Sequence, residues 1–172
     1  MAKEPKLYNE GYEEYPVITS IIGNAVILLW IALGTYLSAA VHYLVGVVYL
    51  VFALLMVGVV LRKLVCANCW YYGRRCATGW GKLSAMMFSR GDVSCFSTGA
   101  GVRMAPAVYG LLTLIPLVLG TVAVVSSDED RVMRIGALVL LLVVSFISGA
   151  VPRRWSCERC KMRYLCPGSA AK

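Results

Sequence analysis

Six of the seven cysteines fall into two short segments that share one spacing. The first segment reads RKLVCANCWYYGRRCATG and the second reads RRWSCERCKMRYLCPG. Each has a basic pair, two further residues and then the pattern C-x2-C-x5–6-C. A C-x2-C turn directs two thiolates at one metal ion, and two such turns supply the four sulfurs of a tetrahedral site. The candidate metal ligands are therefore Cys66, Cys69, Cys76, Cys157, Cys160 and Cys166.

The cysteine spacing leaves three kinds of chemistry open. Zinc is favoured for the two C-x2-C pairs, although they lie much farther apart than the ~15–20 residues usual in zinc motifs. Three cysteines in each segment also suit an iron–sulfur cluster, and Pro167 after Cys166 resembles the end of a ferredoxin motif. A redox dithiol is the third alternative, because the neighbouring basic pairs would lower the pKa of the thiols. Cys95 is either a further ligand or a small buried residue.

The sequence around these cysteines is apolar enough to cross a membrane. Hydrophobic residues make up 59% of the chain, against roughly 45–50% in soluble domains. No Asp, Glu, Lys or Arg occurs between Glu14 and Arg62. That stretch is long enough for two spans, because a helix rises ~1.5 Å per residue through a hydrocarbon core of ~30 Å. We predict an all-α integral membrane protein, a four-helix transmembrane bundle with helices at about residues 17–37, 42–61, 105–125 and 135–151.

The matching segments predict that the chain contains two copies of one unit. Residues 1–104 form the first repeat, with a polar tail, two helices, a cysteine-rich arm at 62–79, and an interfacial helix and linker at 80–104. Residues 105–172 form the second, with two helices and a cysteine-rich arm at 153–168. Pro16 and Pro106 precede the basic pairs by similar distances, and each is predicted to open a helical hairpin. An axis along the membrane normal would relate the repeats and bring the two Cys arms together.

The basic residues predict the orientation of the protein. If the N-terminus is cytoplasmic, all 17 Lys and Arg residues except Arg131 and Arg134 lie on the inside, as the positive-inside rule expects. The net charge of +8 then reflects topology and contact with the lipid bilayer, and no motif for nucleic-acid binding accompanies it. Both termini and both Cys arms of this multi-pass protein are predicted to be cytoplasmic. Because that compartment keeps thiols reduced, a disulfide framework is not expected.

Other polar and aromatic residues have predicted structural roles. Asn24 is predicted to hydrogen-bond between helices. The segment GWGKLSAMMFSRGD, residues 79–92, is predicted to contain a short amphipathic helix on the membrane, with Trp80, Leu83 and Met87 at helical spacing. Residues 97–103 are rich in small side chains and indicate a flexible linker. A belt of aromatic side chains at the membrane boundary is predicted from Trp70, Tyr71, Tyr72, Trp80 and Trp155.

These patterns predict a membrane protein with a cytoplasmic, cysteine-ligated metal centre. The favoured function is a scaffold or docking protein for a cytoplasmic protein partner, in which structural zinc clamps the two repeats. The alternatives are an iron–sulfur electron-transfer protein that links a cytoplasmic donor to a quinone-like carrier, and a membrane dithiol oxidoreductase. Walker, G-x-S-x-G and dinucleotide-binding motifs do not occur, so the sequence identifies neither a catalytic residue nor a small-molecule substrate.

Overall fold

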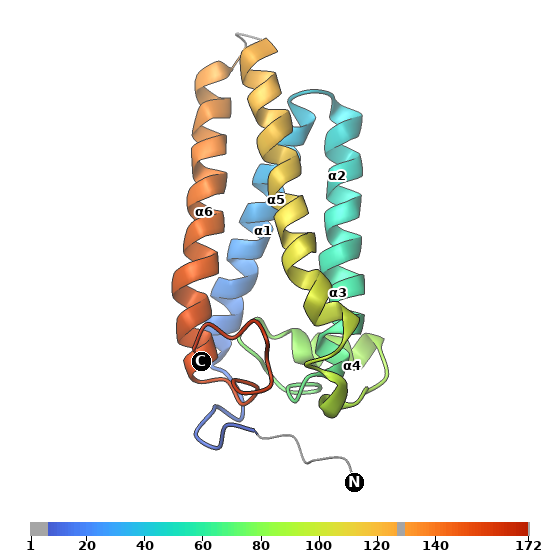
Figure 1. The fold of residues 1–172 in the computed structure, drawn as a ribbon. Helices are drawn as coiled ribbons and strands as arrows, with labels where there is room; N and C mark the ends of the chain where they lie inside the picture. Colours follow the sequence, from blue (N-terminus) through green and yellow to red (C-terminus); the bar gives the residue numbers. More distant parts are fainter. Residues whose placement is uncertain (1–6, 127–129, 172) are drawn as a thin grey trace.

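The computed structural model describes residues 7–126 and 130–171. These residues form an all-helical bundle. The ends of the predicted polar tail and C-terminus, residues 1–6 and 172, lie outside the described residues. Four long helical segments run side by side (Figure 1). They are α1 (Val17–Ala39), the continuous run of α2 (Tyr43–Leu55), the π-helical turn η1 (Met56–Val60) and α3 (Leu61–Leu64), then α5 (Ala100–Ser126) and α6 (Arg131–Glu158). Each segment is long and apolar enough to span a membrane, as predicted.

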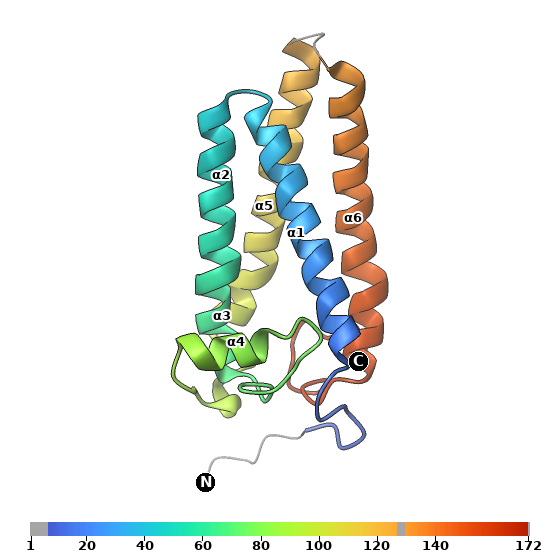
Figure 2. The same ribbon diagram turned by 180° about the vertical axis from the view of Figure 1, so that it is seen from behind.

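The helices alternate in direction, so the Cys arms gather at one end of the bundle (Figures 1 and 2). This polar end consists of residues 7–16, 65–99 and 159–171. The turn between α1 and α2 lies at the opposite end. His42 begins α2 there, because its backbone is extended and its imidazole Nδ1 accepts the N–H of Leu44 at 3.3 Å.

Helix α1 is the centre of the bundle, since it packs against α2, α5 and α6. The core contains Trp30, Ile31, Leu37, Tyr49, Ala53, Leu112 and Leu141. Gly46 allows α2 to approach α1 closely, because a Cβ there would lie 2.5 Å from the Ala39 side chain. Large apolar side chains on the outer faces stay exposed, among them Val48 and Phe146. Such a continuous apolar surface is suited to lipid and not to water.

Helix α5 begins at Ala100, so the predicted linker is wrong for residues 100–103, whereas residues 97–99 lie outside any helix. The helix extends further because Gly101 packs directly on α3, where a Cβ would lie 2.7 Å from the carbonyl carbon of Leu64. Pro106 is consequently inside α5 and does not open the second hairpin. Pro16, by contrast, immediately precedes α1.

Helix α4 (Trp80–Met87) lies across the polar end near α3 (Figure 1). The sequence predicts a short helix at this position, and the structure contains one. Trp80, Gly81 and Ser84 form its buried face. Leu83 and Met87, which the sequence places on one apolar stripe with Trp80, are exposed, so the buried face differs from that stripe.

Candidate metal centre

The two Cys arms contain the same set of backbone turns. The carbonyl of every one of the six cysteines accepts an N–H from the residue three positions later. The bonds are Cys66–Cys69 at 3.2 Å, Cys69–Tyr72 at 3.0 Å and Cys76–Gly79 at 2.9 Å, and Cys157–Cys160 at 3.3 Å, Cys160–Arg163 at 3.0 Å and Cys166–Ser169 at 3.1 Å. Tight turns of this kind direct the side chains of a C-x2-C pair toward one side.

A second correspondence concerns the sulfur of the second cysteine in each pair. The backbone N–H of Tyr71 favours the thiolate of Cys69. The backbone N–H of Met162 does the same for Cys160. Tyr71 and Met162 each lie two residues beyond the cysteine, and both are buried at 2% exposure. Hydrogen bonds from main-chain N–H groups stabilise negative charge on sulfur, so each arm supplies one donor to a thiolate at the equivalent position.

The thiols of the two arms lie close enough to affect one another's ionisation. Burial raises the pKa of Cys69, and negative charge on Cys66, Cys76 and Cys160 would raise it further. Burial raises the pKa of Cys160 to about 11, and charge on Cys76 of the other arm adds to that effect. The arms therefore bring sulfurs that are far apart in the sequence into one region.

The prediction that neighbouring basic pairs would lower the thiol pKa values is wrong for Cys69 and Cys160. Burial is the main cause of the raised pKa at both thiols. At Cys66 burial outweighs the attraction of Arg62 and raises the pKa to about 12. The second basic pair is engaged elsewhere. Arg153 donates to the carbonyl of Gly168 at 2.6 Å, and Arg154 pairs with Glu158 at 3.3 Å. A reactive dithiol needs a lowered pKa, so this environment disfavours the dithiol alternative.

The cysteine side chains do not form a ready-made coordination sphere. In the described part of the chain, no three Cys, His, Asp or Glu side chains are grouped so that they could hold a metal ion. The cysteines are all free thiols. The turns and the N–H donors fit a thiolate-bound metal, whereas the sulfurs would have to move closer together to share one. Cys95 is exposed, not buried, and its sulfur lies 3.9 Å from the Ser94 hydroxyl.

Residues 8–15, here called the N-terminal strap, join the two Cys arms. The N–H of Tyr15 donates to the carbonyl of Arg75 in the first arm at 3.0 Å. The N–H of Tyr12 donates to the carbonyl of Arg159 after α6 at 2.8 Å. Gly11 crosses the second arm so closely that a Cβ would lie 2.7 Å from the nitrogen of Lys161. The strap thus extends along both arms and contacts their main chains.

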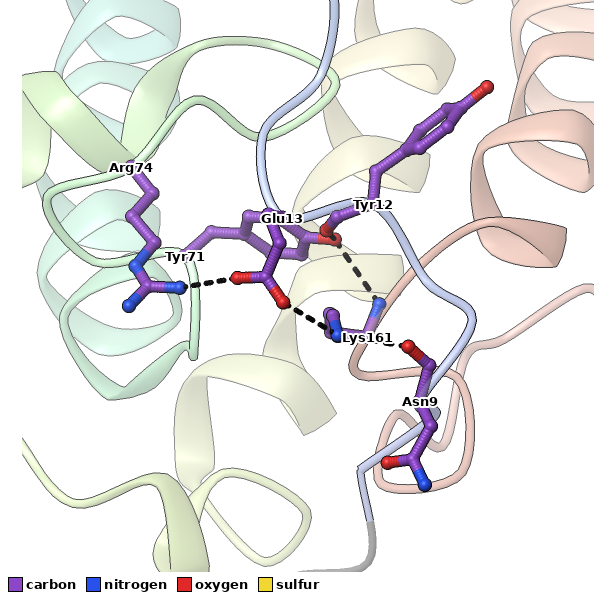
Figure 3. A network of polar contacts seen from close by, with 6 residues as sticks. All are labelled: Asn9, Tyr12, Glu13, Tyr71, Arg74 and Lys161. Atoms are coloured by element: carbon purple, nitrogen blue, oxygen red, sulfur yellow. Dashed lines mark hydrogen bonds and ion pairs between the residues drawn. The ribbon is translucent and has the colours of Figure 1, made fainter.

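Figure 3 shows the side chains that complete this junction. The hydroxyl of Tyr71 donates to the carbonyl of Tyr12 at 2.7 Å and accepts the N–H of Lys161 at 3.2 Å. Glu13 forms ion pairs with Arg74 at 3.0 Å and with Lys161 at 2.8 Å. The hydrogen bond from Lys161 is the main reason why the pKa of Glu13 is lowered. One carboxylate on the strap therefore links a cation from each arm.

The predicted aromatic belt is wrong for Tyr71 and Trp80, which belong to the interior of the polar end. The indole nitrogen of Trp80 donates to Asn24 Oδ1 at 2.8 Å, and the guanidinium of Arg62 lies 4.6 Å from its ring centre. Trp70 stacks under Arg74 at 4.1 Å. These rings are drawn inward because their polar atoms and faces find partners within the fold.

Asn24 hydrogen-bonds to another helix, as predicted, because its side-chain oxygen accepts from Trp80, the first residue of α4. It also connects α1 to the first arm. Its amide nitrogen donates to the carbonyl of Thr78 at 2.8 Å. One turn earlier in α1, the hydroxyl of Ser20 donates to the carbonyl of Cys76 at 3.1 Å. Sequence reasoning missed Ser20 and Thr78, since neither residue belongs to a motif and only the folded arm brings them together.

The two Cys arms therefore offer six partly buried thiols, matched backbone turns, N–H donors to two of the sulfurs, and a cation, Arg62, that favours the thiolate of Cys66. This arrangement can stabilise thiolates once a metal ion replaces their protons. Comparison of this chain with protein-family models, curated proteins and solved structures finds no match.

Proposed function

We propose that the two Cys arms bind one structural zinc ion, and that this clamp locks the two helical hairpins of a membrane scaffold or docking protein together. The ligands would be the two C-x2-C pairs, Cys66, Cys69, Cys157 and Cys160. The observation that carries the proposal is the shared turn geometry of the two arms, in which equivalent cysteines accept equivalent main-chain bonds at nearly equal distances. The pairing of two such turns is typical of tetrathiolate zinc sites.

The electrostatic surroundings support a metal more than a free dithiol. Buried thiols with raised pKa values keep their protons until a cation compensates the charge that ionisation creates. Zinc provides that compensation and releases the protons on binding. Four thiolates around Zn²⁺ leave a net negative charge, and the Arg62 guanidinium, which already favours the thiolate of Cys66, would offset part of it. Cys76 and Cys166 would remain as additional thiols beside the site.

A cytoplasmic polar end is part of the proposal, and it rests on the distribution of the basic residues. The two arginines at the opposite end have a local role. Arg131 Nε donates to the carbonyl of Val124 at 3.2 Å, and Arg134 donates to the carbonyl of Ala123 at 2.9 Å. Both arginines therefore satisfy carbonyls in the last turn of α5, where cations are favourable. This local role explains why they depart from the charge distribution of the other basic residues.

Metal analysis of the protein purified anaerobically in mild detergent tests the proposal. We expect a colourless protein with one zinc per chain, and loss of that zinc in Cys69→Ser and equally in Cys160→Ser. Cys95→Ser is the matched control, because Cys95 is exposed and outside the paired turns, and it should retain full zinc. Folded wild-type protein without metal, or loss of zinc from only one arm's variant, would contradict the shared site. If the protein instead contains iron and shows visible absorption that dithionite bleaches, the bound group is an iron–sulfur cluster and not zinc.

A further inference from the structure

Four cations of the polar end form ion pairs with two acidic residues of the N-terminal strap. Glu13 pairs with Arg74 and Lys161, and Glu14 pairs with Arg75 and Lys82. Among the residues that the structure describes, three cations have side chains with neither an acidic, a hydrogen-bonding nor an aromatic partner: Lys63, Arg90 and Arg103. Two of these three line the same cleft, so positive charge is concentrated there without a counter-charge from the protein.

The cleft has a volume of about 390 Å³ and lies between the end of α3 and the segment after α4. Lys63 comes from the last turn of a helical segment long and apolar enough to cross the membrane. Arg90 follows α4 by three residues. The lining of the cleft also includes Asn68, Met87, Phe88 and Gly91. The cleft is therefore next to the point where the apolar span ends, which is the level of lipid headgroups.

Two hydrogen bonds join the two sides of the cleft, and a third lies within one side. The N–H of Gly91 donates to the carbonyl of Ala67 at 3.0 Å. The hydroxyl of Tyr72 donates to the carbonyl of Phe88 at 2.7 Å. The amide of Asn68 donates to the carbonyl of Leu64 at 3.1 Å. Because residues 88–91 are fixed against η2 (Cys66–Asn68), the two cations are held on the same cleft by the fold itself.

The lining of the cleft fits an anion with an apolar tail. Among the described residues, no acidic side chain lines the cleft, and the nearest acid in sequence, Asp92, accepts the N–H of Ser94 at 2.8 Å. An anion bound between these two exposed cations would offset their mutual repulsion. Met87 forms part of the wall, and the apolar surface continues along α4 through Met86 and Leu83, which are exposed.

We propose that this cleft binds the phosphate group of an anionic membrane lipid. Lys63 and Arg90 would contact the phosphate oxygens, since ammonium and guanidinium groups are the usual phosphate donors. The exposed apolar face of α4 would contact the acyl chains. Inorganic phosphate has the same headgroup chemistry but gains nothing from this apolar face, so we assign the cleft to the lipid.

Native mass spectrometry of the detergent-solubilised protein tests this assignment, with phosphatidylglycerol and phosphatidylcholine supplied in equal amounts. Wild-type protein should retain phosphatidylglycerol selectively. Each cation near an anionic surface contributes on the order of 1 kcal/mol, so Lys63→Gln/Arg90→Gln should bind phosphatidylglycerol roughly 30-fold more weakly. Arg103→Gln/Arg154→Gln removes the same charge outside the cleft and should change binding little. An equal loss in both double variants would overturn the assignment, because general surface charge would then explain the binding.

Two further experiments distinguish lipid binding from phosphate binding, and a loss of binding from a loss of folding. Inorganic phosphate at the same concentration should not displace phosphatidylglycerol; complete displacement would overturn the lipid assignment in favour of a soluble phosphate. Lys63→Arg/Arg90→Lys keeps both charges and should retain selective binding. If this charge-preserving variant elutes and unfolds like the wild type yet loses the lipid, the two side chains do not act as general phosphate donors and the proposal fails.

Discussion

The hydroxyl of Tyr49 in α2 donates a hydrogen bond of 2.8 Å to the main-chain carbonyl of Leu112 in α5. Within its own helix that carbonyl lacks its usual donor, because Pro116 stands four residues later and has no N–H. Both Tyr49 and Leu112 are buried, so the tyrosine pairs a carbonyl that neither water nor lipid could satisfy. Gly34 makes room for the ring, since a Cβ there would lie 2.7 Å from Tyr49 Cζ.

Tyr49→Phe should therefore destabilise the bundle while preserving its shape. Removal of the hydroxyl leaves the Leu112 carbonyl unpaired in an apolar interior, at a cost of about 1–2 kcal/mol. Thermal unfolding in detergent, followed by circular dichroism at the helical bands, measures the loss. Tyr43→Phe serves as the control, because Tyr43 is 67% exposed. Equal melting temperatures for the two variants would show that the Leu112 carbonyl finds another donor.

Tyr71→Phe should loosen the N-terminal strap from the Cys arms. The substitution removes the bond to the Tyr12 carbonyl and leaves the N–H of Lys161 without its acceptor. Burial raises the pKa of Tyr71, so the hydroxyl stays protonated and able to donate at neutral pH. Leaving one buried group unpaired costs about 1–3 kcal/mol. Hydrogen exchange of residues 8–15 should accelerate, whereas the transmembrane helices should exchange as in the wild type.

Asn24→Leu should detach the first arm from α1. The leucine is of similar size but cannot bond to the Thr78 carbonyl or accept from the Trp80 indole. We expect a loss of about 1–3 kcal/mol and a change in tryptophan fluorescence as Trp80 becomes solvated. Thr35→Val is the matched control in the same helix, because the Thr35 hydroxyl bonds only to the Ile31 carbonyl of its own helix among the described contacts. Its effect on fluorescence should be negligible.

Acid should release the strap through Glu13. The hydrogen bond from Lys161 and the nearby charge of Arg74 lower the pKa of this carboxyl, compared with about 4.3 for an unperturbed glutamate. A folded-state pKa below the unfolded value means that the stabilisation is complete above about pH 5 and is lost as the pH falls below about 4. Hydrogen exchange of the strap, corrected for intrinsic rates, should show this transition. High salt should weaken the effect, because Glu13 is largely exposed.

Variants separate Glu13 from the other acids. Glu13→Gln should remove most of the pH dependence of strap exchange and should raise the exchange rate at neutral pH. Glu10→Gln affects a carboxylate that accepts only the exposed hydroxyl of Tyr8 among the described contacts, so the transition should persist in that variant. If it disappears in Glu10→Gln and persists in Glu13→Gln, the ion pairs with Lys161 and Arg74 do not hold the strap.

The limits of the sequence predictions are clearest at residues whose partners come from far along the chain. Asn24 and Trp80 each suit a membrane helix or its boundary, and the sequence assigns them there. The structure pairs them with each other across 56 positions. Gly101 reads as part of a flexible linker, yet its missing side chain allows α5 to begin against Leu64. In both cases the local residue type permits several environments, and the distant partner selects one.

The sequence alone determined the four apolar helices, because a hydrocarbon core requires long uncharged runs in which every backbone group bonds within the helix. It also determined the paired C-x2-C spacing, and each of its cysteines forms the turn expected of that spacing. Only the tertiary structure decided that the N-terminal strap joins the arms and that burial, not neighbouring cations, controls the pKa of Cys69 and Cys160. Desolvation depends on everything packed around a group, and that packing is set by contacts between residues far apart in the chain.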